Sequence, residues 1–329
     1  HTNRDANDSG KGLACDQNVR GVKKTMSIRI AMLGTGKIAQ EQLTPALNLA
    51  ERGVLWSVLS RDRDRARDFA ARHQAHSPDP GFEDLDALLA DPALDAVIIA
   101  SPDGLHAEQA IRAARAGKHV LCEKPLATSP EEVDLMAEAA ERNKVIIQEA
   151  AMMRFHQQTV DVKSLLADGV IGDVRLLRSV FSFYLMQDQD IRLDPEVGGG
   201  VLWDLGSYQV SLSRTLLHGE PVEVSGWQIL NDKGVDRTFT GQMRFESGAI
   251  SQFYCSNESA PAWDAELIGS TGMMHLDLPY QNHPGIDGHV RIHRGSIADD
   301  TVTFGDSTDQ MVEETLTFRN NNAYQDEVD

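Results

Sequence analysis

A glycine-rich turn between an apolar run and a helical stretch constrains the fold of this chain more than any other feature. Residues 28–33 read IRIAML, a strand pattern, and Gly34, Gly36 and Ala39 follow with the spacing of a dinucleotide-binding turn. The first glycine permits the tight bend, the second lets backbone approach a pyrophosphate, and Ala39 lets helix and strand pack closely. An accidental glycine turn is the alternative. The residues expected to contact a cofactor at this turn are Gly34, Thr35, Gly36, Lys37 and Ile38.

The pattern after the turn alternates short apolar runs with helical stretches. Further strands are predicted over residues 54–60, 96–100, 119–122 and 144–148. The clearest helix is predicted over 130–143, because Ser129 can act as N-cap, Pro130 suits the first helical position and Glu132 completes a capping box. Pro45 is expected to kink or restart the first helix. This alternation predicts an α/β fold, a doubly wound parallel sheet of the Rossmann type.

The period changes after about residue 150. A helix is predicted over 157–167, ended by Gly169. Strands are predicted over residues 174–184, 222–230, 239–245, 250–256, 266–268 and 273–276, with tight turns joining the last two pairs. The second half is therefore predicted to be an α+β domain with an open, mainly antiparallel sheet. We expect a disordered extension over 1–26, a Rossmann domain over 27–149 and a substrate-binding and dimerisation domain over 150–329.

Charge and cysteine content narrow the class of protein. The net charge of −19 repels phosphate backbones and anionic membrane surfaces, so nucleic-acid and membrane partners are not expected; solubility or a moderately salty habitat accounts for the acidity. The three cysteines form no CxxC pair, and no export signal or apolar run of membrane-spanning length is present, so a cytoplasmic protein is predicted. His289 and His293 lack a third ligand, so they are expected to be solvated and no metal is predicted.

The end of the second predicted strand bears on the choice of cofactor. NAD sites usually place Asp or Glu there, to accept hydrogen bonds from the ribose 2′-hydroxyl. This chain has Ser60 and Arg61 instead, which can donate to a 2′-phosphate, and Arg65 follows one helical turn later. NADP is therefore predicted over NAD. The alternative is a solvated helix start in which the arginines pair with Asp62 and Asp64.

Two loops at the carboxyl edge of the predicted sheet carry groups suited to proton chemistry. The cofactor-facing candidates there are Ser101, Pro102, His106, Glu123 and Lys124. A lysine at this edge can hydrogen-bond a reacting oxygen and stabilise a developing alkoxide without a metal. A solvent-facing loop lysine is the alternative for Lys124, and the bond to Pro125 is a candidate cis peptide. His106 is expected to lie near the cofactor or to brace its loop, and the alternative is a purely structural role at a helix start.

Four motifs occur together along the chain: the GxGxxA turn, Ser101-Pro102-Asp103 with His106, AGKHVLCEKPLA at 116–127, and GGGVLWDLG at 198–206. This combination resembles the glucose-fructose oxidoreductase and inositol dehydrogenase (Gfo/Idh/MocA) family over residues 28–329. The resemblance implies a Rossmann domain followed by an open sheet that covers the nicotinamide and often forms the dimer contact. A homodimer or homotetramer through the C-terminal sheet is therefore expected.

The resemblance also implies catalytic residues. In the family the glycine-rich segment precedes Asp-x-Gly-x-His, whose histidine is commonly the acid/base; the matching residues here are Asp204 and Tyr208, with tyrosine in the place of histidine. Four residues apart, they share a helical face. A phenol near the Lys124 ammonium has its ionised form favoured. Lys124 is expected to polarise the oxygen, Tyr208 to carry the proton and Asp204 to orient substrate or catalytic groups.

Tyrosine at this position resembles the branch that contains glucose-fructose oxidoreductase and dimeric dihydrodiol dehydrogenase. The stretch 149–156 resembles that branch too, although Met153 replaces its usual aromatic residue. Arg154 is a candidate for the substrate site, with a salt bridge to an acidic neighbour as the alternative. Family members usually continue beyond a segment like 322–327 into helices that pack on the first domain, so a truncated C-terminus is expected.

The expected activity is reversible hydride transfer between NADP(H) and a secondary alcohol or carbonyl of a sugar, polyol or related hydroxyl compound. One alternative is a non-catalytic regulatory protein that senses the dinucleotide on the same fold. Retention of Lys124, Asp204 and Tyr208 counts against it. Another is tetrapyrrole reduction or trans-dihydrodiol oxidation, which would differ only in the lining of the substrate pocket.

Overall fold

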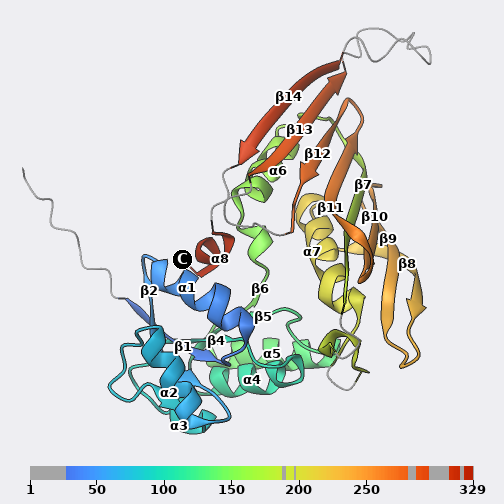
Figure 1. Ribbon diagram of the computed structural model, residues 1–329. Helices are drawn as coiled ribbons and strands as arrows, with labels where there is room; N and C mark the ends of the chain where they lie inside the picture. The colour runs from blue at the N-terminus through green and yellow to red at the C-terminus, as the bar shows by residue number, and fades with distance from the viewer. Residues whose placement is uncertain are drawn as a thin grey trace, which may run out of the picture.

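The computed structural model describes residues 27–186, 190–195, 198–280, 287–295, 311–318 and 322–328, and contains two sheets (Figure 1). The predicted extension over 1–26 lies outside the described residues. The first sheet has six strands in the order β3-β2-β1-β4-β5-β6, all paired in parallel. Its strands are β1 (Ile28–Leu33), β2 (Gly53–Leu59), β3 (Gly81–Phe82), β4 (Ala96–Ile99), β5 (His119–Glu123) and β6 (Ile147–Ala150). The predicted Rossmann fold is therefore confirmed.

Helices cover both faces of this sheet. They are η1 (Ala39–Leu43), α1 (Thr44–Leu49), α2 (Arg63–Arg72), α3 (Leu85–Leu89), α4 (His106–Arg115) and α5 (Pro130–Asn143). Alternate side chains of β1 enter separate cores: Met32 packs with η1, α1 and α2, and Leu33 packs with α3, α4 and α5. Strands buried on both faces read as continuous apolar runs, which explains why the strand positions could be predicted.

Local sequence signals set several helix ends. Ser129 caps α5 by accepting a hydrogen bond from the Glu132 backbone N–H at 3.2 Å, and the Glu132 carboxylate accepts from the Thr128 backbone N–H at 2.9 Å. The helix covers the predicted range, but β6 begins three residues later than predicted because Lys144 ends α5 with φ +56°. The helix that follows the glycine-rich turn begins as the π-helical turn η1 and continues as the α-helix α1, which has Pro45 in its first turn. Proline has no backbone N–H to donate within a helix, so a change of helix type at this point agrees with the predicted restart.

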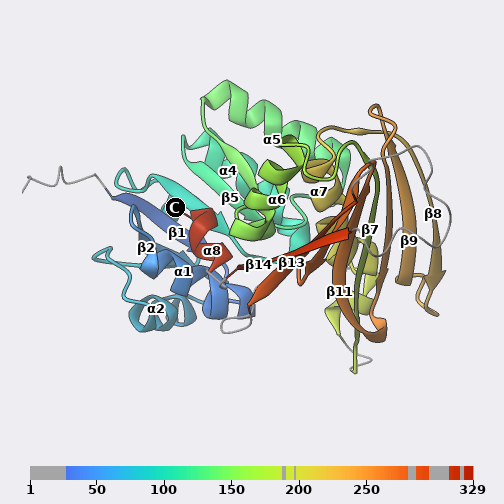
Figure 2. The same ribbon diagram turned by 90° about the horizontal axis from the view of Figure 1, so that it is seen from above.

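The second sheet has eight strands in the order β14-β13-β12-β11-β7-β10-β9-β8, antiparallel except for the β7–β10 pair. The strands are β7 (Val174–Tyr184), β8 (Pro221–Leu230), β9 (Asp236–Phe245), β10 (Ile250–Ser256), β11 (Glu258–Gly269), β12 (Gly272–Asp277), β13 (Gly288–Gly295) and β14 (Met311–Phe318). Helices α6 (Gln157–Ala167) and α7 (Ser207–Leu216) lie between this sheet and the Rossmann sheet (Figure 2). The predicted mainly antiparallel sheet is confirmed.

One face of the second sheet is packed and its β8 edge is open. Phe181 and Phe253 on the packed face contact the core that Leu205 and Leu212 complete. Strand β8 is exposed over nearly its whole length, including Trp227 at 68%. After β14, helix α8 (Ala323–Val328) packs against α1, and Tyr324 contacts the cores of both halves. The chain thus returns to the Rossmann sheet at the edge where ligands bind in this fold.

Candidate active site

The glycine-rich turn follows β1 directly. Gly34 has φ +111°, and a Cβ there would lie 2.4 Å from the Ala100 carbonyl oxygen, so only glycine fits. At Gly36 a Cβ would meet no atom of the described residues within 4 Å. The protein thus leaves open space beside the Gly36 backbone. That space fits the close approach of a dinucleotide pyrophosphate.

The two glycines should respond differently to alanine. Gly34→Ala combines left-handed strain with a backbone clash, and we expect a loss of about 2–4 kcal/mol in the free energy of unfolding. Gly36→Ala should unfold within about 1 kcal/mol of wild type, as a Gly substitution without strain does, yet bind NADPH about tenfold more weakly. Urea unfolding and NADPH titration measure the two effects. Equal stability losses in both variants would contradict the assignment.

The other residues of the turn lie beside a basic side chain from α2. Arg65 Nη2 donates to the Thr35 carbonyl oxygen at 3.2 Å, so Arg65 contacts the turn itself. Lys37 is exposed and lies 3.9 Å from Glu41, and Ile38 packs on the core beneath α1. The alternative interpretation paired the arginines of this segment with Asp62 and Asp64. The Arg65 guanidinium instead donates to the backbone of the turn.

The end of β2 presents the predicted phosphate-binding residues. Ser60 is partly exposed, and its backbone N–H donates to the Phe82 carbonyl oxygen at 3.0 Å. Arg61 is exposed next to it. Asp62 caps α2 by accepting hydrogen bonds from the backbone N–H groups of Asp64 and Arg65. The Asp62 carboxylate is therefore engaged with the helix start, and the Arg61 side chain next to it is exposed.

His106 ties the two catalytic loops together. Its buried ring lies with Nδ1 2.8 Å from the Pro125 carbonyl oxygen and Nε2 3.0 Å from the Ser101 carbonyl oxygen. Ser101 also donates to Gln109 at 2.8 Å, and Pro102 lines a pocket beside this loop. Of the two roles considered for His106, this geometry matches the bracing of the loop. The histidine sets the separation of the loops after β4 and β5.

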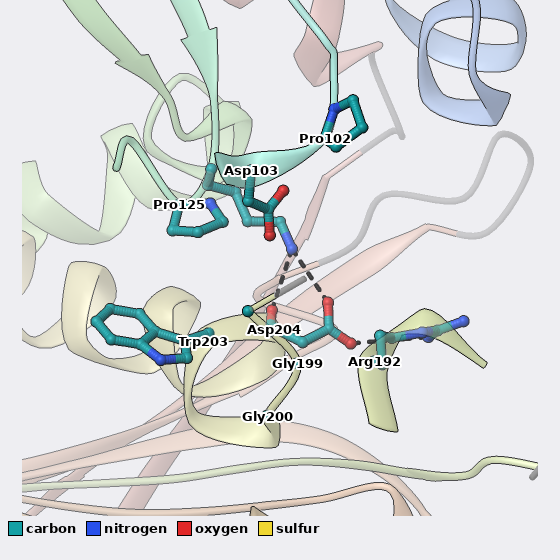
Figure 3. Close-up of a pocket in the computed structure, with 10 residues that line it drawn as sticks. Pro102, Asp103, Pro125, Arg192, Gly199, Gly200, Trp203 and Asp204 are labelled. Carbon is teal, nitrogen blue, oxygen red and sulfur yellow. Dashed lines mark hydrogen bonds and ion pairs between the residues drawn. The ribbon is translucent and has the colours of Figure 1, made fainter. Parts of the chain in front are cut away.

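Lys124 and Asp204 meet across the two halves of the chain (Figure 3). Lys124 Nζ lies 3.2 Å from Asp204 Oδ1 and 3.2 Å from the Asp204 carbonyl oxygen, and the two side chains are 22% and 24% exposed. Asp204 belongs to η6 (Leu202–Gly206), the π-helical turn that leads into α7. The peptide between Lys124 and Pro125 is cis, as predicted. The ion pair therefore holds the loop after β5 against the start of α7.

Tyr208, in the first turn of α7, lies close to the Lys124 ammonium. Its ring centroid is 5.0 Å from Lys124 Nζ, and its ring packs edge-on against Phe181 and Tyr280. Tyr208 lines a small cavity of about 20 Å³ that adjoins Lys124, Ser207 and Ser211 among others. The three side chains named as catalytic candidates are thus brought together from segments 80 residues apart in sequence.

Burial governs the proton affinities at this site. Burial raises the pKa of Tyr208, and the Lys124 ammonium lowers it, as expected, but by less, so the net shift is upward. Burial lowers the pKa of Lys124, but its acidic neighbours, which include Asp204 and Glu123, together raise it more, and the ammonium is retained. Burial also raises the pKa of Glu123 to about 7. At neutral pH the site therefore presents a neutral phenol beside a cation.

A pocket of about 340 Å³ opens beside Lys124. Asp103 lies on its wall, with a pKa raised by burial, and Trp203, 45% exposed, offers an indole face. Its lining residues are Pro102, Asp103, Lys124, Pro125, Arg192, Gly198, Gly199, Gly200, Trp203 and Asp204. Positive and negative side chains both line this space, and an aromatic surface adjoins them. Such a lining suits a hydroxyl-rich molecule with an apolar ring face.

Arg154 is not among the residues that line this pocket. It is the exposed last residue of the turn η3 (Met152–Arg154) and lines a separate pocket of about 410 Å³ with Glu149, Phe155 and Lys163 among others. The placement of Arg154 at the substrate site stays a prediction. Met153, the departure from the resembled branch, is fully buried and adjoins Tyr208 in the small cavity.

The structure adds residues that the sequence patterns did not single out. Arg192 approaches Asp204 Oδ2 to 3.7 Å from the turn η4 (Ile191–Leu193). Glu327 of α8 is buried, with its pKa raised to about 9 by burial and by the nearby Glu123 and Glu149. Neither residue belongs to a recognisable sequence motif, and the position of each depends on tertiary contacts. Within the described ranges, no helix is long and apolar enough to cross a membrane, and no metal-ligand cluster of His, Cys, Asp and Glu occurs.

Comparison with known proteins agrees with this geometry. A family model described as an oxidoreductase family with an NAD-binding Rossmann fold, Gfo/Idh/MocA, matches residues 28–151, and the model of its C-terminal domain matches residues 159–275. An uncharacterized oxidoreductase of Rhizobium meliloti is 36% identical over 266 residues, 80% of this chain and 78% of its own. A D-xylose 1-dehydrogenase (NADP(+)) of Haloferax volcanii is 38% identical over 223 residues, 67% of each chain.

A solved structure shows the same architecture. The crystal structure of KijD10, a 3-ketoreductase from Actinomadura kijaniata in complex with NADP and TDP-benzene, superposes with a TM-score of 0.79 and 28% identity, covering 92% of this chain and 87% of its own. Fold and site together define an NAD(P)-dependent dehydrogenase or reductase. The chain belongs to the Gfo/Idh/MocA oxidoreductase family.

Proposed function

We propose that this protein catalyses reversible hydride transfer between NADP(H) and a secondary alcohol or carbonyl of a sugar, polyol or related hydroxyl compound. The observation that carries the proposal is the convergence of Lys124, Asp204 and Tyr208 beside a pocket at the carboxyl edge of the Rossmann sheet. Relatives named as a D-xylose dehydrogenase and a 3-ketoreductase support this substrate class.

Each of the three side chains has its own role in the proposed reaction. When bound, the nicotinamide donates or accepts the hydride at its C4 carbon. Lys124 stabilises negative charge on the substrate oxygen as the C–H bond forms or breaks. Tyr208, neutral because it is buried, donates the proton to that oxygen in the reduction direction and takes it back in oxidation. Asp204 holds the ammonium in place through its 3.2 Å contact.

Turnover measurements test the proposal. We expect initial rates of NADP reduction with members of a panel of pentoses, hexoses, polyols and dihydrodiols. Tight NADPH binding without turnover of any of these compounds would contradict enzyme activity and favour the cofactor-sensing alternative. Calorimetric titration with NADPH, run on the same preparation, separates an inactive protein from one that has lost its fold.

NADP preference is assigned to Arg61. Arg61→Ala should reduce kcat/KM for NADP by about 10–100-fold, because it removes a charge-assisted contact to the 2′-phosphate. The value for NAD, which lacks this phosphate, should change by less than about threefold. Arg63→Ala is the matched control, since the Arg63 guanidinium pairs with Asp79 at 2.8 Å. An equal loss with both cofactors would refute the role of Arg61.

The proposed assembly is a homodimer or homotetramer through the second sheet. The exposed apolar side chains of β8 support it: Val222, Val224, Trp227 and Ile229 are each about half exposed or more. Exposed apolar groups that gather on one element mark an interaction surface more often than scattered ones do. This edge is continuous with the sheet that packs over the Rossmann half (Figure 2).

A further inference from the structure

The carboxylate of Asp204 is divided between two cations. Oδ1 faces Lys124 Nζ at 3.2 Å, and Oδ2 faces Arg192 Nη1 at 3.7 Å, as the dashed lines in Figure 3 show. Lys124, Asp204 and Arg192 all line the 340 Å³ pocket. A carboxylate held in this way presents a fixed acceptor to a molecule in the pocket, since neither oxygen can rotate away without breaking an ion pair.

Arg192 is held more firmly than a surface arginine. Its Nε and Nη2 donate to the two carboxylate oxygens of Asp190 at 2.9 and 3.1 Å, and its guanidinium lies 5.4 Å from the centroid of the Phe183 ring. The Arg192 carbonyl oxygen accepts from the Gly200 backbone N–H at 3.0 Å, which joins this turn to the glycine-rich segment before η6. The bidentate pair fixes the plane of the guanidinium.

The contact between Arg192 and Asp204 is too long for a direct hydrogen bond. At 3.7 Å it exceeds the usual range of about 2.7–3.2 Å for an N–H donor and an oxygen acceptor. A hydroxyl group suits the space between them, because it can accept from Arg192 Nη1 and donate to Asp204 Oδ2 at once. Water or a substrate hydroxyl can satisfy this geometry.

We propose that Arg192 and Asp204 together recognise a hydroxyl group on the carbon next to the reacting carbon. This inference rests on the proposed function, in which the reacting oxygen contacts Lys124. Lys124 and Arg192 contact the two oxygens of one carboxylate, so a group bound between Arg192 and Oδ2 is close enough to Lys124 to belong to the same small substrate as the reacting oxygen. Oxygens on neighbouring carbons are separated by about one hydrogen-bond length, near 3 Å. The preferred substrate class is therefore a vicinal diol or an α-hydroxycarbonyl compound.

The charges around Arg192 favour a neutral group over an anion. Asp190 already compensates the guanidinium, and Asp103 and Asp204 line the same pocket. An added phosphate or carboxylate would meet these carboxylates at close range. The adjacent hydroxyl takes no part in the redox balance. In oxidation the carbinol C–H bond electrons leave as hydride to NADP, the O–H proton passes to Tyr208, and the neighbouring hydroxyl is unchanged.

Matched substrates test this role. trans-Cyclohexane-1,2-diol and cyclohexanol, or D-glucose and 2-deoxy-D-glucose, differ by the adjacent hydroxyl alone. For the wild-type enzyme we expect kcat/KM to be about 10–100-fold higher with the hydroxylated member, as one charge-assisted hydrogen bond provides. Arg192→Leu should lower kcat/KM for that member to near the value of its partner. The deoxygenated member should change by less than about threefold, and NADPH affinity should be retained.

Two further variants distinguish recognition of the hydroxyl group by Arg192 from a general structural effect of losing an arginine. Arg192→Lys keeps the charge without the planar fork, so we expect it to recover part of the preference. Arg214→Leu removes an arginine that pairs with Glu220 outside the pocket and should leave the ratio of the two substrates unchanged. Equal losses on both substrates in Arg192→Leu, or a ratio unaltered by it, would overturn the inference.

The outcome for the wild-type enzyme distinguishes the two proposals. Turnover of the deoxygenated member as fast as its partner would overturn the recognition of an adjacent hydroxyl and leave hydride transfer standing. A wild-type enzyme that binds NADPH and turns over no compound of the panel would overturn the proposed function itself, and this inference with it.

Discussion

Lys124→Met should lower kcat by about 10³-fold, because it removes the charged group that stabilises a developing alkoxide. Methionine is apolar and unbranched, and it fills much of the space of the lysine side chain. The variant should bind NADPH within about threefold of the wild type, since the proposed phosphate contacts are at Gly36 and Arg61. Stopped-flow measurement of hydride transfer and an NADPH titration give both quantities.

The Lys124→Met variant should also remain folded. Asp204 keeps its contact with Arg192 at 3.7 Å, so its carboxylate is not left without a cation. Lys163→Met, which replaces an exposed lysine of α6, is the control for loss of a positive charge and should retain wild-type turnover. Undiminished turnover by Lys124→Met would reject the assignment of Lys124 to the chemistry.

Tyr208→Phe should lower kcat by about 10²–10⁴-fold, the range for loss of a positioned acid or base. The ring keeps its edge-on contacts with Phe181 and Tyr280, so the melting temperature should change little. Because only the hydroxyl is removed, a large loss of activity in a stable protein points to the proton itself. Thermal unfolding and steady-state rates, measured on one preparation, give the two results.

The pH dependence follows from the raised pKa of Tyr208. A raised pKa keeps the phenol protonated through neutral pH, so carbonyl reduction should be insensitive to pH there and decline only as the phenol ionises in the alkaline range. Alcohol oxidation needs the phenolate form of Tyr208 to accept the alcohol proton, so its rate should rise with pH as the phenolate becomes populated. The same alkaline increase in Tyr208→Phe would show that another group carries the proton.

The Rossmann half could be predicted because its signals are local. Parallel strands covered on both faces read as apolar runs, and the turn at Gly34 needs a glycine at φ +111°. The Ser129 cap and Pro130 placed α5 over its observed range. The strand β3 (Gly81–Phe82) was missed because two residues carry no periodicity. Its pairing with β2 is a tertiary contact.

In the second half of the chain, the type of sheet could be predicted, but the bounds and number of its strands could be predicted less well. Helix α6 and strand β7 occupy the predicted residues, whereas β11 begins at Glu258, eight residues before the predicted start. Apolar and polar residues alternate only weakly over the first residues of β11. This part of the strand is defined by its pairing with β7, whose register shifts between Glu258 and Ala262. Strands β13 and β14, which pair with each other, were not predicted.

Some residues of the candidate site could be predicted from the sequence and others could not. Lys124 and Asp204 could be named because motif and spacing place them at a ligand-binding edge, and the structure brings them to 3.2 Å. Arg192 could not, because its position depends on Asp190 and Phe183, which no sequence period connects to Asp204. The lowering of the Tyr208 pKa by Lys124 could be predicted from the motifs. The larger upward effect of burial could not, because the burial of the ring depends on tertiary packing.

A crystal structure of the complex with NADPH and a bound polyol would show whether Lys124 and Tyr208 act on the same substrate oxygen. We expect C4 of the nicotinamide next to a substrate carbon whose oxygen lies within hydrogen-bond distance, about 2.6–3.2 Å, of both Lys124 Nζ and the Tyr208 hydroxyl. A nicotinamide bound away from the pocket of Lys124 and Asp204, or a Tyr208 hydroxyl turned from the substrate oxygen, would contradict it.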